Sequence, residues 1–134
     1  MKRIAAIDFG LKRIGIAISD ENGRIAFPLT VVEGGKKAVQ NICSALKDKR
    51  LSKIVIGLPR LLSGEEGQMA NVVRRFGEEL GVAMSLPIEW IDERLSSKMA
   101  DRSLMEAGLK RKNRSEVLDA AAASLMLQTF LDRP

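Results

Sequence analysis

The N-terminal part of the chain alternates short apolar runs with turns. One apolar run covers residues 4–7 and ends at Asp8, and a second covers residues 14–19. A turn that contains Gly10 separates them, and apolar runs bounded in this way predict paired strands at the centre of a sheet. The two runs are therefore expected to be neighbouring β-strands.

A third strand is predicted over residues 25–27. It follows Asn22-Gly23, a dipeptide typical of a tight β-hairpin turn, so it should pair antiparallel with the second strand. Pro28 has no backbone N–H, and we expect it to limit how far the hydrogen-bonded ladder of this strand continues. The first three strands therefore predict an antiparallel meander.

Beyond residue 35 the pattern alternates between helical and strand spacing. Apolar residues recur with the period of a helix in two segments, which contain Ala38, Ile42, Ala45 and Leu46, and then Met69, Val72, Val73, Phe76 and Leu80. Apolar runs at residues 53–57 and 87–91 predict two more strands. A third helix is predicted from Ser96 or Ser97 to Gly108, then a basic connector over residues 110–114 and a final helix over residues 115–131.

This order of elements predicts an α/β protein with a mixed five-stranded sheet. The first three strands should be antiparallel, whereas the fourth and fifth should be parallel because helical crossovers connect them. Helices should flank the sheet on its two faces. No linker, repeat or low-complexity segment interrupts the sequence, so we expect residues 1–134 to form a single domain.

Composition narrows the chemistry. The chain has 22 Lys and Arg against 17 Asp and Glu, a net charge of +5 that suits a polyanionic partner such as nucleic acid. It has no histidine and one cysteine, Cys43, so imidazole-based catalysis, thiolate metal sites and an internal disulfide are excluded. No segment is apolar over the roughly 20 residues that a membrane span needs, and we expect a cytoplasmic protein with no membrane partner.

Asp8 stands where a buried residue is expected. Alternation along the first strand puts it on the same face as Ile4 and Ala6. An unpaired carboxylate on such a face is costly, so a partner such as a bound cation is expected. The ordinary alternative is that Asp8 belongs only to the turn that follows.

Further acids occupy similar positions later in the chain. Asp92 and Glu93 follow the last predicted strand, and in α/β sheets ligand sites favour the carboxyl ends of strands. Asp119 begins a helical stripe that continues through the apolar residues Ala122, Ala123, Met126 and Phe130. The ordinary alternatives are that Asp92 or Glu93 caps a helix or pairs with Arg94, and that Asp119 complements the helix dipole.

Taken together, the acids predict a metal site. Clustered carboxylates without histidine or thiolate suit hard cations such as Mg²⁺ or Mn²⁺. Two such ions can activate water and stabilise the leaving oxygen of a phosphodiester. The basic surface would hold the phosphate backbone.

Four segments of the sequence occur in an order that is specific to one family. They are Asp8-Phe9-Gly10-Leu11-Lys12-Arg13-Ile14-Gly15-Ile16-Ala17, Ile56-Gly57-Leu58-Pro59 with Ser63-Gly64 and Phe76, Asp92-Glu93-Arg94-Leu95-Ser96-Ser97, and Asp119-Ala120-Ala121-Ala122-Ala123. On these segments nearly the whole chain resembles the YqgF (RuvX) family, relatives of the RuvC Holliday-junction resolvases with a ribonuclease-H-like fold.

The resemblance implies a ribonuclease-H-like nuclease in which Asp8, Glu93 and Asp119 bind metal and act in catalysis. RuvC-type resolvases carry a further acid shortly after the helix aspartate, whereas this chain has Ala122 three residues on. A fourth metal ligand would then come from Asp92, from backbone or from water. We expect two Mg²⁺ or Mn²⁺ ions.

Members of the family have been described as Holliday-junction resolvases and as nucleases that trim the 5′ end of precursor 16S ribosomal RNA. We favour the RNA-processing role for this chain. The alternatives are resolution of four-way DNA junctions and a non-catalytic nucleic-acid-binding module. An actin-like ATPase, which opens with a similar Asp-x-Gly hairpin, needs a second glycine-rich phosphate-binding segment that this chain lacks.

Basic residues near the acids are candidates for binding the nucleic-acid backbone of structured RNA or branched DNA. They are Lys12, Arg13, Arg94, Lys110, Arg111, Lys112 and Arg114. Arg13 and Arg94 could instead neutralise the neighbouring carboxylates, and residues 110–114 could be a solvated connector. Junction cutting would favour a symmetric homodimer, whereas RNA trimming would be compatible with a monomer.

Overall fold

The computed structural model describes residues 2–61, 63–92 and 111–134, with residues 111–118 as backbone only. The helix predicted from Ser96 or Ser97 to Gly108 lies outside these residues. In chain order the elements are β1 (Arg3–Asp8), β2 (Arg13–Ser19), β3 (Ala26–Glu33), the short 3-10 helix η1 (Gly35–Lys37), α1 (Ala38–Leu46), β4 (Leu51–Leu58), α2 (Gln68–Met84), β5 (Ile88–Asp92) and α4 (Arg111–Leu131).

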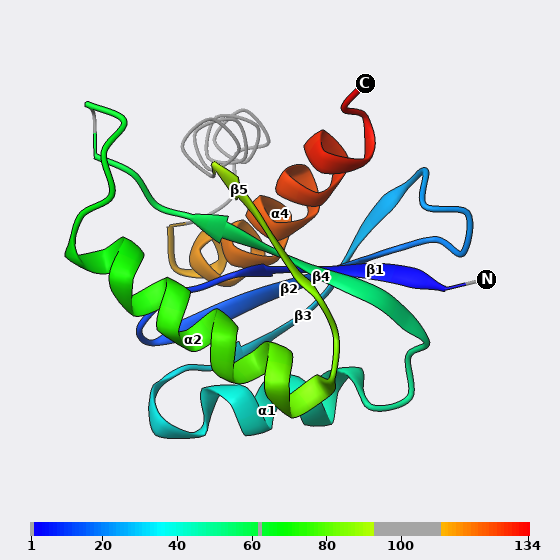
Figure 1. Cartoon of the computed structure of the whole chain (residues 1–134), viewed down its shortest axis with the longest axis horizontal. Coiled ribbons are helices and arrows are strands. Elements are labelled where there is room, and N and C mark those ends of the chain that lie inside the picture. The colour runs from blue at the N-terminus through cyan, green and yellow to red at the C-terminus, as the bar shows by residue number, and fades with distance from the viewer. Residues whose placement is uncertain (1, 62, 93–110) are drawn as a thin grey trace.

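The five strands form one mixed sheet in the order β3-β2-β1-β4-β5. β1 pairs antiparallel with β2, and β2 pairs antiparallel with β3. β4 lies parallel to β1 and to β5. The predicted mixed α/β sheet is confirmed, and its helices lie on both faces, with α1 and α2 on one and α4 on the other (Figure 1).

The alternation of side chains along β1 divides the core into two parts. Ala5 and Ile7 belong to the larger part, which α1 and α2 cover, whereas Ala6 belongs to the smaller part beneath α4. Ile4 also packs against the smaller part. Asp8 continues the series of Ile4 and Ala6, so its Cβ points toward the face that α4 covers.

Small residues on the sheet let α4 approach closely. Ala6 and Ala17 are paired across β1 and β2, and both are fully buried under the helix. From the helix side, the predicted stripe of Ala122, Ala123, Met126 and Phe130 is buried as expected, together with Leu127. The larger of these side chains share one core cluster with Ala6, Ala17 and Val55 of the sheet, which fixes the position of the helix.

The expected limit at Pro28 was wrong. β3 continues through Pro28 to Glu33, and its pairing with β2 shifts register so that Ile16 lies opposite Thr30 and Ala17 opposite Pro28. β3 is an edge strand, and edge strands and bulges are where proline is tolerated, because no ladder needs its missing N–H.

The start of the last helix was also predicted too late. Residues 111–114, expected to form a connector, belong to α4, which begins at Arg111. Arg and Lys are good helix formers, and no glycine or proline interrupts this segment, so nothing local prevents the helix from starting before Ser115. Within the described ranges no helix is long and apolar enough to cross a membrane.

One side chain ties the C-terminal end of α4 to the β2–β3 hairpin. The Gln128 Oε1 atom accepts a hydrogen bond of 2.9 Å from the backbone N–H of Ala26, and its Nε2 donates one of 2.9 Å to the carbonyl of Arg24. The amide therefore satisfies backbone groups of the hairpin as a neighbouring strand would.

We predict that Gln128→Ala destabilises the protein by about 1–3 kcal/mol, because it leaves these backbone groups without their partners. The hydrogen-exchange protection of the Ala26 amide should fall. The neighbouring Thr129→Ala is the control, since the Thr129 hydroxyl only donates to the Leu125 carbonyl within the helix. Equal loss of stability in the two variants would contradict this anchoring role.

Candidate active site

The ends of the three parallel strands gather at one edge of the sheet. β1 ends at Asp8, β4 at Leu58 and β5 at Asp92. Leu58 and Asp92 are paired directly, and Ile7, next to Asp8, is paired with Ile56 in β4. Carboxyl ends of parallel strands are where α/β sheets bind ligands, so this edge is the candidate site.

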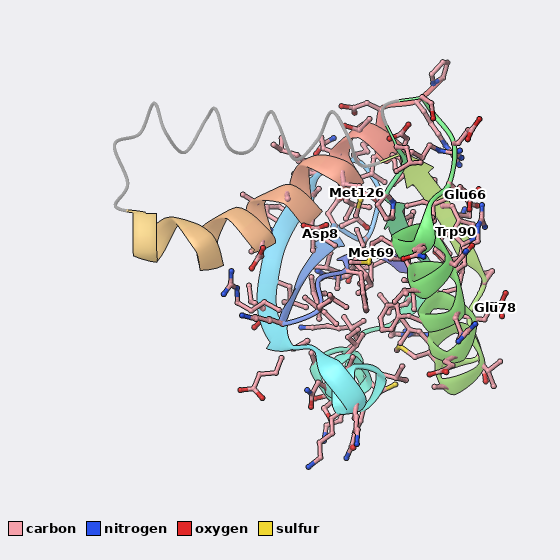
Figure 2. The ribbon with its side chains drawn as sticks, turned by 90° about the vertical axis from the view of Figure 1, so that its left-hand side faces the viewer. Asp8, Glu66, Met69, Glu78, Trp90 and Met126 are labelled. Carbon is pink, nitrogen blue, oxygen red and sulfur yellow. The ribbon has the colours of Figure 1, made fainter. Side chains whose placement is uncertain are left out.

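Asp8 and Asp119 are brought together at this edge although 110 other residues separate them in the chain. Asp8 is paired with Gly15 across β1 and β2. A Cβ atom added at Gly15 would overlap the backbone carbonyl of Asp119, so α4 touches the sheet at this point. Directly opposed residues of an antiparallel pair have Cα atoms about 5 Å apart, so Asp8 and Asp119 are neighbours. Figure 2 shows Asp8 just below the ribbon of α4.

Arg13 holds the Asp119 carboxylate. Its Nε donates a hydrogen bond of 2.8 Å to Oδ2 of Asp119, and the side chains are 45% and 25% exposed. Charge-assisted hydrogen bonds of this length are among the stronger polar contacts in proteins. The sequence left two roles open for Arg13, which were to bind the nucleic-acid backbone or to neutralise a neighbouring carboxylate. In this structure Arg13 neutralises the carboxylate of Asp119.

Asp92 lies on the other face of the sheet. Its paired residue Leu58 belongs to the core that α1 and α2 cover, and residues paired across parallel strands point to the same side. Oδ2 of Asp92 is 3.9 Å from Nε of Arg60, and Nη1 of the same arginine is 4.0 Å from Oε2 of Glu66. The structure therefore does not bring Asp92 onto the face that Asp8 and Asp119 share.

Glu66 belongs to an ion-pair network beside Asp92. Its two carboxylate oxygens accept hydrogen bonds of 2.6 and 2.9 Å from Arg74. These bonds, with the charges of Arg74 and Arg60, lower the pKa of Glu66. Arg74 also lies over the ring of Trp90, 5.1 Å from its centroid. The network joins the loop after β4 to α2 and β5 on the α2 face.

The remaining predicted residues are placed only in part. Glu93, Arg94 and Lys110 lie outside the described residues. Arg111, Lys112 and Arg114 are described only as backbone at the start of α4. Among the residues that the structure describes, no three Asp, Glu, Cys or His side chains could hold one metal ion.

The turn between β1 and β2 lies beside a cavity of about 510 Å³. One wall is formed by Leu11, Lys12 and Arg13, and the other by residues 31–34. Lys12 is exposed there, as expected for a residue that contacts a phosphate backbone. The cavity therefore adjoins the Arg13–Asp119 ion pair.

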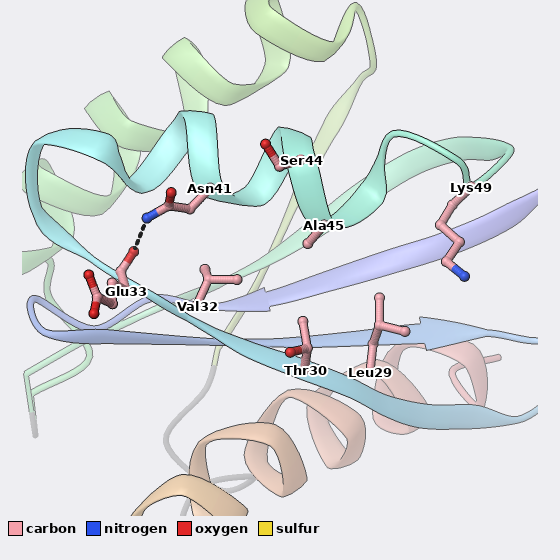
Figure 3. A pocket seen from close by; sticks show the side chains of 8 residues that line it. All are labelled: Leu29, Thr30, Val32, Glu33, Asn41, Ser44, Ala45 and Lys49. Carbon is pink, nitrogen blue, oxygen red and sulfur yellow. Dashed lines mark hydrogen bonds between the residues drawn. The ribbon is translucent and has the colours of Figure 1, made fainter.

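A cavity of about 620 Å³ lies elsewhere, between β3 and α1 (Figure 3). Leu29, Thr30 and Val32 line it from the strand, and Asn41 donates a hydrogen bond of 3.0 Å from Nδ2 to the Glu33 carbonyl at its end. None of the predicted site residues lines it, so we assign it no part in the site.

Sequence reasoning missed the part that Gly15 plays. The sequence places Gly15 within a family motif, whereas the structure shows it as the contact point between α4 and β2. The available signal was a lone glycine within the apolar strand at residues 14–19, because such a glycine often marks the close approach of another backbone.

Residues 2–133 match the RuvX family, described as Holliday junction resolvase. The chain belongs to the RuvX family. It is 42% identical to the "Putative pre-16S rRNA nuclease" of Sulfurihydrogenibium sp. (strain YO3AOP1). The alignment spans 135 residues and covers 99% of this chain and 92% of that protein. The protein of the same name from Chloroflexus aurantiacus (strain ATCC 29366 / DSM 635 / J-10-fl) is 42% identical over 131 residues, 96% of this chain and 86% of that protein. The family description and the names of these relatives all denote nucleases, enzymes that hydrolyse phosphodiester bonds. The resemblance expected from the four motifs is confirmed.

Solved structures agree on the fold. The chain is similar to T. thermophilus RuvC in complex with a Holliday junction substrate, with a TM-score of 0.55, 19% identity and coverage of 98% of this chain and 97% of that one. It is also similar to Fowlpox virus resolvase in complex with Holliday junction DNA, with a TM-score of 0.57, 10% identity and coverage of 98% and 99%. The ribonuclease-H-like fold implied by the resemblance is confirmed.

We predict that Gly15→Ala separates Asp119 from Asp8. The added methyl would meet the helix backbone, which no side-chain movement can relieve, so α4 must move away from β2 at a cost of about 1–3 kcal/mol. Thermal unfolding should show this loss. Gly67→Ala is the control, since the methyl there would meet only the exposed side chain of Leu61. A Gly15→Ala variant as stable as the control would contradict the contact.

Proposed function

We propose that this RuvX chain is a metal-dependent endonuclease that processes the 5′ end of precursor 16S rRNA. Asp8, Glu93 and Asp119 are the proposed metal-binding and catalytic residues. The observation that carries the proposal is the convergence of Asp8 and Asp119 at the carboxyl edge of the sheet, through the contact of α4 with Gly15. Two neighbouring carboxylates repel each other, and a cation bound between them would offset this repulsion.

The donor atoms fit a hard cation. Asp8 and Asp119 offer only carboxylate oxygens, the ligands that Mg²⁺ and Mn²⁺ prefer, and the chain has no histidine to favour a softer metal. Two bound ions would supply an activated water and stabilisation of the leaving oxygen. Asp92 is left out of the proposed ligands, since it pairs with Arg60 on the opposite face.

Arg13 would change partners during binding. Its ion pair with Asp119 balances one acid before the metal and substrate arrive. Once a cation balances Asp119 instead, the Arg13 guanidinium is able to bind a phosphate in its place, with the exposed Lys12 beside it. The two roles considered for Arg13 then apply to successive states of the site.

The substrate assignment follows the nearer relatives. The curated relatives at 42% identity carry a name that specifies precursor 16S rRNA, whereas the two resolvases share 19% and 10% identity with this chain. Holliday-junction resolution is the second candidate, favoured by the family description. RNA trimming needs no symmetric dimer, whereas paired cuts across a junction do.

We predict that Asp8→Asn lowers cleavage of a precursor 16S rRNA fragment in Mn²⁺ by at least about 100-fold, since a neutral amide is a poor ligand for a hard cation. Affinity for the fragment without metal should stay within about twofold or increase, because a negative charge near the phosphates is lost. Asp48→Asn is the matched control, since Asp48 follows α1 at the opposite edge of the sheet and is exposed. Unchanged cleavage by Asp8→Asn would contradict the proposed site.

The same assay should include a four-way DNA junction, with and without Mn²⁺. We expect metal-dependent cleavage of the RNA fragment to exceed that of the junction. Symmetric cuts in the junction with no cleavage of the RNA would replace the proposed substrate by the second candidate. Binding of both without cleavage at any metal concentration would identify a non-catalytic nucleic-acid-binding module.

A further inference from the structure

A third cavity, of about 220 Å³, adjoins the proposed catalytic edge on the α2 side of the sheet. Phe9, which directly follows Asp8, lines it together with Phe76 and Val72 of α2. The two phenylalanine rings are in contact, with their centroids 4.6 Å apart and their planes at 46°. The cavity is smaller than the roughly 300–1,000 Å³ of sites for drug-sized ligands, so it suits a single ring system.

Cations flank this apolar floor. Lys36 of η1 and Arg75 of α2 line the cavity from opposite elements, and both side chains are exposed. Within the described part of the chain neither has an ion-pair partner. Glu79 also lines the cavity, one turn beyond Arg75 and farther from the strand ends. An apolar floor between two cations matches one nucleotide, with a flat base and a charged phosphate.

The β1–β2 turn, which follows Asp8, also supports one side of this cavity. The backbone N–H of Gly34 donates a hydrogen bond of 2.9 Å to the carbonyl of Lys12, and a Cβ at Gly34 would lie 2.6 Å from the Leu11 carbonyl. The segment that leads into η1 is therefore packed backbone to backbone against the β1–β2 turn. This packing joins the turn that follows Asp8 to the segment that carries Lys36.

Val72 forms an exposed apolar wall of this cavity. Val72 belongs to the apolar helical spacing that predicts α2, yet the residue is 44% exposed. Met69, one turn earlier on the same helix, belongs to the same spacing and is 40% exposed. An apolar side chain left open beside two cations gains by covering a nucleobase, as bases stack on apolar and aromatic surfaces.

We propose that this cavity binds one unpaired nucleotide of the substrate next to the bond that is cut, with the base against Phe9 and Val72 and its phosphate between Lys36 and Arg75. The inference rests on the proposed nuclease function. It adds a requirement for an unpaired nucleotide beside the cleavage position, which a fully paired duplex does not offer.

Two matched pairs of variants test the cavity by the fluorescence anisotropy of a single-stranded RNA oligonucleotide, without divalent metal. Val72→Asp should weaken binding roughly tenfold, since it puts a carboxylate where the base lies. Val82→Asp on the same helix, where the valine is 82% exposed, should change affinity less than about twofold. Glu79→Gln should bind more tightly, because it removes a negative charge beside the phosphate.

The double variant Lys36→Ala/Arg75→Ala should lose roughly 5- to 20-fold in affinity, and the slope of log affinity against log salt should fall by about 1.4. Arg24→Ala/Lys47→Ala removes the same charge at the opposite edge of the sheet and should leave that slope within about 0.5 of the wild-type value. For a duplex RNA of the same length, Val72→Asp and Val82→Asp should behave alike.

Equal effects of Val72→Asp and Val82→Asp on the single strand would overturn the nucleotide cavity. The proposed nuclease function would be unaffected, because it is tested by cleavage in Mn²⁺. Failure of the wild-type chain to bind the single-stranded RNA would likewise overturn the nucleotide cavity, whereas failure to cleave in Mn²⁺ would overturn the nuclease function. A Val72→Asp effect as large on duplex as on single-stranded RNA would contradict the requirement for an unpaired base.

Discussion

The close contact between α4 and β2 is the constraint on which the proposed site depends. Gly15 has no side chain to separate the two backbones. Ala6 and Ala17, which are paired with each other, place only methyl groups beneath the following turns of the helix. This contact sets the height of Asp119 above the sheet. Because Gly15 is paired with Asp8, the same contact that packs the helix also brings the backbone of Asp119 close to that of Asp8.

The alternation of side chains sorts the acids at this edge by face. Asp8 points toward α4, whereas Asp92 shares its face with Leu58 and joins the network of Arg60 and Glu66 on the α2 side. Arg13 balances Asp119 and Arg60 balances Asp92, so one acid on each face is paired with an arginine. The α2 side also carries the cavity proposed to bind a nucleotide, so one nucleic-acid strand would contact both faces at the edge.

Much of the fold could be predicted from the sequence because most of its elements have regular apolar periods. Alternation along β1 placed Asp8 correctly on the face of Ile4 and Ala6, and the stripe on α4 was buried as expected. Two predictions about where elements begin or end were wrong, because the sequence signals used for them act only locally. Pro28 was tolerated since β3 lies at the sheet edge, and α4 began earlier because its basic residues form helices well.

The site could be predicted less completely, since no local pattern encodes contacts between distant segments. The pairing of Arg13 with Asp119 and of Asp92 with Arg60 depends on where turns and helix ends meet in space. The exposure of Val72 likewise depends on the gap between α2 and the β1–β2 turn, which helical periodicity does not describe. The roles of Asp8, Glu93 and Asp119 in metal binding stay predictions.

The most direct measurement is a double-mutant cycle on Mn²⁺ binding, by isothermal titration calorimetry of the wild-type chain, Asp8→Asn, Asp119→Asn and the double variant. If the two carboxylates bind the same metal ions, each single variant should lose nearly as much affinity as the double variant, because either change disrupts one shared site. Losses that simply add, or Mn²⁺ binding that neither substitution weakens, would contradict a shared metal site.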